Sequence, residues 1–163
     1  MPDRNALQKI GKLALASRMK ILNERLFKDA SRVYHAVGID FEPQWFPVFY
    51  LLNQEKQALP ITGIARELGL SHPAVIKLTR SMTHAGLLES FEDPEDRRKH
   101  LVRISQEGQK LVPELERIWE IFEKAIENLF EETGHDLIAV IERTEQALNR
   151  LEMADRIEEQ KKK

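Results

Sequence analysis

Basic side chains occur at two places in the chain where their spacing suits hydrogen bonding to phosphate groups. Lys77 and Arg80 are three residues apart in a helical pattern, so both lie on one side of a helix. Ser71 is a suitable N-cap for that helix, and Pro73 fits its first turn. A helix N-terminus attracts phosphate, and Lys or Arg reaches phosphates and guanine edges. The candidate contact residues here are Ser71, His72, Pro73, Ala74, Lys77 and Arg80.

The second basic group follows the turn signal Asp93-Pro94, between two runs rich in strand-forming residues. A carboxylate two residues before an arginine, as Asp96 is before Arg98, can hold the guanidinium in one orientation. An arginine oriented in this way loses less side-chain entropy when it enters a narrow minor groove. This pattern predicts a hairpin whose tip contacts a duplex through Asp96, Arg97, Arg98 and Lys99.

Two short helices must position the first group. Thr62 is the predicted N-cap of the first helix, and Gly69 and Gly86 are expected to end the two helices in turn. A short strand over 59–61 is expected to pair with the hairpin. The apolar residues that repeat at helical spacing are Ile64, Ala65 and Leu68 in the first helix and Val75, Leu78 and Met82 in the second.

These segments resemble the MarR (multiple-antibiotic-resistance regulator) family of winged helix-turn-helix transcriptional regulators. The resemblance is carried by IARELGLSHPAVIKLTRSMTHAGLL, by DPEDRRKHLVRIS and by the EGQKL that follows, and it extends from about Leu7 to about Leu151. Asp96 and Arg98 match the wing motif of that family, in which the arginine enters the minor groove. The resemblance implies a DNA-binding homodimer. The chain has no cysteine, so the thiol-oxidation switch of some family members is excluded.

An aromatic cluster follows the first long helical pattern. Pro43 suits the start of a helix there, and Pro47 is expected to bend it. The resemblance implies that Trp45, Phe49 and Tyr50 line a pocket for a small aromatic or phenolic effector. The alternative is that they are ordinary core residues. Arg18, Lys20 or His35 are candidate counter-charges for an acidic effector.

Long amphipathic patterns flank the central segment. Residues 5–37 are predicted to form one long helix, and 106–157 to form further long helices, with Ser105 and Asp136 as helix caps and the tail RIEEQKKK frayed. These patterns carry more apolar surface than a small winged helix needs to cover itself, which argues for a second copy. We therefore expect a single domain over 1–163, with dimerisation helices at 5–37 and 106–157 around a DNA-binding lobe at 42–105.

Composition limits the other possibilities. The formal net charge is −2, but residues 104–160 carry fifteen Asp/Glu against six Lys/Arg, so the acid is concentrated away from the basic groups. No stretch approaches the roughly 20 apolar residues of a membrane span, and no signal peptide is evident, which predicts a cytoplasmic protein. None of the five histidines has a second histidine three or four residues away, and we expect no enzyme activity, metal site or cofactor.

The sequence thus predicts a mainly α fold with a small β-hairpin wing. It predicts a ligand-responsive repressor that binds double-stranded DNA as a homodimer on a pseudo-palindromic operator. Two alternatives stay open: a winged-helix module that binds proteins, and the regulatory half of a larger fusion protein.

Overall fold

The computed structural model describes residues 5–94, 96 and 100–162. The chain divides into two compact units, Met1–Val112 and Pro113–Lys163, and each is described by itself. The elements are α1 (Asn5–Ile10), the 3-10 turn η1 (Gly11–Ala14), α2 (Leu15–Ala36), the 3-10 turn η2 (Pro43–Trp45), α3 (Phe46–Glu55), β1 (Leu59–Pro60), α4 (Ile61–Leu68), α5 (His72–His84), β2 (Leu88–Glu92), β3 (His100–Ile104), α6 (Gln106–Thr133), α7 (Leu137–Arg150) and α8 (Met153–Lys161).

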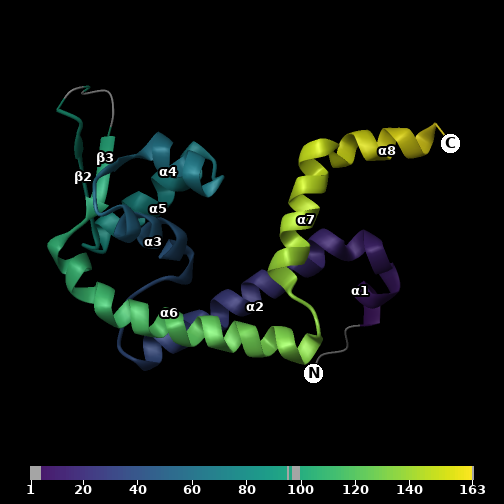
Figure 1. Cartoon of the computed structure of the whole chain (residues 1–163), viewed down its shortest axis with the longest axis horizontal. Coiled ribbons are helices and arrows are strands. Elements are labelled where there is room, and N and C mark those ends of the chain that lie inside the picture. Colours follow the sequence, from purple (N-terminus) through teal and green to yellow (C-terminus); the bar gives the residue numbers. More distant parts are fainter. Residues whose placement is uncertain (1–4, 95, 97–99, 163) are drawn as a thin grey trace. The chain divides into compact units, whose positions relative to one another are not determined.

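The three strands form one antiparallel sheet in the order β1-β3-β2, with helices α3, α4 and α5 gathered beside it (Figure 1). Leu59 is paired with Val102, and Leu88 with Ile104. Pro60 lies in the edge strand β1, where a residue without an N–H is tolerated. The predicted fold, mainly helical with a small β wing and long terminal helices, is confirmed, and so is the short strand beside the hairpin.

Helices α4 and α5 form the predicted helix-turn-helix. Gly69 and Gly86 follow them with φ of +63° and +76°, the left-handed conformation that glycine adopts without steric cost. The Ser71 side chain accepts a hydrogen bond from the Ala74 N–H at 3.4 Å, as its predicted capping role requires. The predicted Thr62 cap is wrong, because α4 already begins at Ile61, directly after the extended Pro60.

The core of the first unit lies where α3, α4 and α5 meet the sheet. Phe41 lies among other rings at its edge, with centroid distances of 5.2 Å to Tyr34, 5.6 Å to Trp45 and 5.5 Å to Phe49. The largest fully buried side chains of this unit are Val48, Phe49, Ile64, Val75, Met82 and Val102.

Two helix predictions near the N-terminus need correction. The single helix expected over 5–37 is broken at Gly11, whose φ of +66° cannot continue an α-helix. The helix expected to start at Pro43 and bend at Pro47 starts instead at Phe46, after the separate turn η2. Pro47 therefore lies in the first turn of α3, where no helical hydrogen bond is lost.

The second unit contains most of α6, together with α7 and α8. The Asp136 side chain accepts from the Ala139 N–H at 3.0 Å, which confirms it as the cap of α7. Of the tail predicted to fray, residues 156–161 are instead helical and belong to α8. Arg156 joins it to α7, because its Nε donates to the Leu151 carbonyl at 3.0 Å and its Nη2 to the Ala147 carbonyl at 2.7 Å. Within the described residues, no helix is both long and apolar enough to cross a membrane.

Candidate nucleic-acid interface

The candidate contact residues of α5 share its solvent-facing side. His72, Pro73, Lys77 and Arg80 are exposed together with Ser71, and Ala74 is half-buried. The opposite side of the helix is fixed in the core by the buried residues Val75, Thr79 and Met82. Thr79 is buried, but its hydroxyl is not left unsatisfied, because it donates a hydrogen bond to the Val75 carbonyl at 2.9 Å. The helix therefore presents one exposed side that carries two basic side chains, Lys77 and Arg80, in its middle turns.

The backbone at the start of α5 offers fewer donors than the sequence suggested. Pro73 has no N–H, the Ala74 N–H is bonded to Ser71 Oγ, and the Val75 N–H donates to the Ser71 carbonyl at 3.1 Å. Among the described residues, this leaves the His72 N–H as the first-turn donor without a partner. A phosphate at this helix end would therefore depend on one backbone donor, the helix dipole and nearby side chains.

The wing tip is only partly described. Strands β2 and β3 lead into it, and Asp96 is half-buried. Arg97, Arg98 and Lys99 lie outside the described residues, so the predicted orientation of Arg98 by Asp96 stays a prediction.

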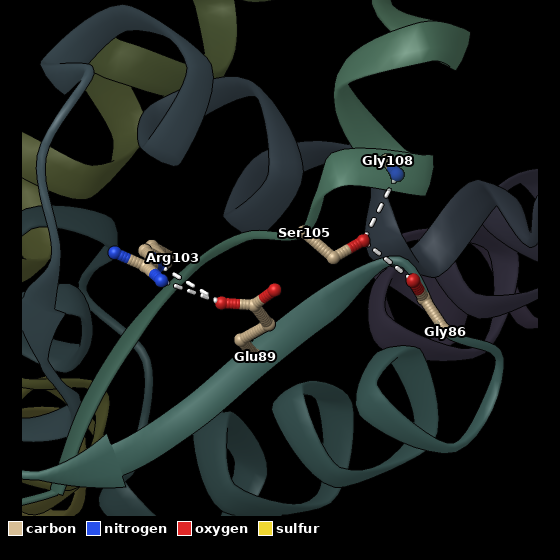
Figure 2. A network of polar contacts seen from close by, with 5 residues as sticks. All are labelled: Gly86, Glu89, Arg103, Ser105 and Gly108. Atoms are coloured by element: carbon tan, nitrogen blue, oxygen red, sulfur yellow. Dashed lines mark hydrogen bonds and ion pairs between the residues drawn. The ribbon is translucent and has the colours of Figure 1, made fainter.

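Arg103 has a role at the base of the wing that the sequence did not predict. Its Nε and Nη2 donate to one oxygen of Glu89 at 2.9 and 2.8 Å (Figure 2), and its guanidinium lies 5.2 Å from the centroid of the Phe91 ring. Glu89 faces Arg103 directly across the β2–β3 pair. The charge of Arg103 is therefore offset, and the positive charge of the wing is concentrated in residues 97–99.

Ser105 joins the end of α5 to the start of α6. Its hydroxyl donates to the Gly86 carbonyl at 2.5 Å and accepts from the Gly108 N–H at 2.9 Å (Figure 2). Its own N–H donates to the Leu87 carbonyl at 2.9 Å. The predicted capping role of Ser105 is confirmed. Its bond to Gly86 additionally fixes the wing strands relative to the exposed helix α5.

Gly108 allows this junction to close. A Cβ at this position would lie 2.3 Å from the Leu87 carbonyl oxygen and 2.7 Å from Ile104 Cγ2. The first of these atoms is backbone and cannot move aside without shifting the start of β2. In the sequence, Gly108 stands out only as part of the segment EGQKL, and its packing role was not predicted. The available signal was a glycine three residues after a predicted serine cap.

The three aromatic residues proposed to line an effector pocket lie in different environments, two in the core and one at the surface. Trp45 and Phe49 are 4% and 0% exposed and lie in the core, whereas Tyr50 is 43% exposed and is tilted against Phe46 at 5.4 Å. Among the described residues, Trp45 Nε1 is buried without a hydrogen-bond partner. Three cavities in this part of the chain, of about 820, 290 and 690 Å³, are lined by other residues.

Comparison with known proteins agrees with the resemblance drawn from the sequence. Residues 39–99 match the model of the MarR family. The fold is similar to MepR of S. aureus in a complex with DNA, with a TM-score of 0.68 and 21% identity over 84% of this chain and 98% of that one. A MarR/EmrR family transcriptional regulator from Acinetobacter sp. ADP1 gives a TM-score of 0.65 and 17% identity over 84% and 96%. No relative is found among curated protein sequences.

Proposed function

Because the chain has the fold of MarR-family transcriptional regulators, we propose that it binds double-stranded DNA and represses transcription as a homodimer. The observation that carries this proposal is the exposed side of α5, which carries Lys77 and Arg80 on a helix whose N-terminus is capped by Ser71. The fold is that of MepR, whose structure has been determined with DNA bound. A cytoplasmic location follows from this function.

Each basic group has a distinct part in the proposed complex. Lys77 and Arg80 contact phosphates or base edges in the major groove. Arg98, oriented by Asp96, enters the minor groove, while the neighbouring basic residues contact the backbone. Arg103 takes no direct part, because it is bonded to Glu89 at the base of the wing.

Exposed apolar side chains support a homodimer. In the first unit, Leu13 is 91% exposed, and a groove of about 820 Å³ runs along α1, η1 and α2. In the second unit, Ile121 and Ile138 are 65% and 53% exposed. Isolated exposed apolar residues are ordinary, but a continuous apolar groove is typical of an interface.

The charges of these helices are complementary between the two ends of the chain. Residues 5–36 carry seven Lys/Arg against two Asp/Glu, whereas residues 113–160 carry five against fourteen. Pairing the basic helices of one copy with the acidic helices of another would bury apolar surface and bring opposite charges together. A two-fold dimer then presents two copies of α5 to one duplex, spaced by about 34 Å, one turn of DNA.

Selection of bound sequences from random duplex DNA, using the purified full chain, tests the function directly. We expect enrichment of a motif with two-fold symmetry. In a gel shift with that motif, Arg98→Ala should weaken binding by about 1–3 kcal/mol. Failure to enrich any motif would reject the proposal and favour the alternative of a winged-helix protein-interaction module.

A further inference from the structure

A cavity of about 290 Å³ lies between α2 and the segment 39–44 that leads into η2. Phe27, Ser31 and His35 line it from α2, where they follow one another at intervals of four residues and so share one side of the helix. Phe41 and the carboxylates of Asp40 and Glu42 line it from the connecting segment. Its volume lies just below the usual range for small-molecule sites, about 300–1,000 Å³, so it suits a small ligand.

The lining of this cavity is acidic and aromatic. With histidine counted as neutral, its lining residues carry two negative charges and no positive charge. Glu42 accepts a hydrogen bond from the Gln44 amide, whereas the exposed Asp40 has no partner among the described residues. The ring of Phe27 is 41% exposed. A free carboxylate beside an accessible aromatic ring favours a cation and repels an acid.

The cavity is also connected to the candidate DNA-binding helix. The segment 39–44 continues into η2, and η2 contacts both α2 and α5. Phe41, in the cavity wall, packs edge-on against Trp45 of η2 at 5.6 Å. Trp45 is buried, so a displacement of Phe41 cannot be absorbed by solvent and must shift η2 or its neighbours.

We propose that this cavity binds a small organic cation with an aromatic group, and that its occupancy changes the position of α5 through Phe41 and η2. The proposal deepens the regulator function above and depends on it only for its effect on DNA. It also changes the expected effector. Of the three candidate counter-charges for an acidic effector, Arg18 and Lys20 do not line this cavity, and His35 lines it together with the two acidic residues Asp40 and Glu42.

Calorimetric titration of the full chain with benzyltrimethylammonium tests the site without DNA. Saturable binding is expected, and Asp40→Asn should weaken it by about tenfold, as loss of one close charge pair would. Asp29→Asn is the matched control. Asp29 also lies on α2 but is two residues from both Phe27 and Ser31, so it points to another side, where it pairs with Arg32 at 3.5 Å. Phenylacetate, the anionic probe, should not bind.

The second measurement is DNA affinity over a titration with benzyltrimethylammonium. We expect it to fall at least threefold for the wild type, and for Asp40→Asn to fall only at about tenfold higher cation concentration. Absence of saturable binding, equal binding of phenylacetate, or equal losses in Asp40→Asn and Asp29→Asn would overturn the site. Binding that depends on Asp40 but leaves DNA affinity unchanged would overturn the coupling to α5. A chain that binds the cation through Asp40 but binds no DNA would reject the regulator function and leave the site itself supported.

Discussion

At Gly108 the absence of a side chain allows two elements to meet. Gly108→Ala should destabilise the fold by about 1–3 kcal/mol, because its methyl group would overlap the Leu87 carbonyl oxygen and Ile104 Cγ2. Chemical denaturation measures this change. Glu107→Ala in the same turn is the control, because Glu107 is exposed and its ion pair with Lys110 is solvent-screened. Equal stability of the two variants would contradict the close packing described here.

Substitution of Lys77 or Arg80 tests whether the exposed side of α5 contacts DNA. Each alanine substitution should weaken DNA binding by about 1–3 kcal/mol while leaving the free energy of unfolding nearly unchanged, because both side chains are exposed. Fluorescence anisotropy with the selected duplex provides the measurement. Lys110→Ala removes an exposed charge from α6 and serves as the control. If the control weakened binding as much as the two α5 variants, the effect would be one of net charge alone.

At the scale of elements, α8 depends on one arginine. A helix of this length is marginal in isolation, so the two bonds from Arg156 to carbonyls of the α7 end are expected to decide its stability. Arg156→Lys keeps the charge but cannot make both bonds. Amide hydrogen exchange in 153–161 should then accelerate by about tenfold. Arg150→Lys, at an exposed position, should have little effect, and unchanged exchange in Arg156→Lys would contradict this role.

Elements marked by a single strong local signal could be predicted from the sequence. Ser71, Ser105 and Asp136 cap helices as expected, because a side-chain oxygen before an apolar helical run has few other uses. The predicted Thr62 cap was wrong for a physical reason. Pro60 is itself the extended residue that precedes α4, so the helix begins at Ile61 and Thr62 lies inside it. Helical periodicity also hid the break at Gly11, since an apolar pattern continues across a left-handed residue that only the backbone reveals.

The sequence was sufficient to predict which residues of α5 are exposed at the candidate interface. It was not sufficient to predict which basic side chains are paired with acidic ones. The exposed side of α5 follows from spacing alone. The pairing of Arg103 with Glu89 needs the register of β2 and β3, which the sequence does not determine. Burial of Trp45 and Phe49 could not be separated from a pocket lining, because large aromatic residues suit both places.

For the whole molecule, the proposed homodimer depends on apolar residues that the single chain leaves exposed. Leu13, which is 91% exposed, is expected to be buried by a second copy. Leu13→Glu should raise the dimer dissociation constant by about tenfold or more, given the roughly 1.5–3 kcal/mol for burying a leucine. Sedimentation at several protein concentrations provides the test. Gln54→Glu adds the same charge at an exposed polar position of α3, and equal behaviour of the two variants would count against an interface at Leu13.

Binding of the selected duplex at increasing salt concentration tests the central claim most directly. If two copies of α5 and two wings contact phosphates, two chains should bind per duplex. The logarithm of affinity should then fall linearly with the logarithm of salt concentration, with a slope of about −0.9 for each phosphate neutralised. Lys77→Ala and Arg80→Ala should each make that slope shallower by about one or two, depending on whether one or both copies contribute. A slope near zero, or one chain per duplex with both variants unchanged, would contradict the account.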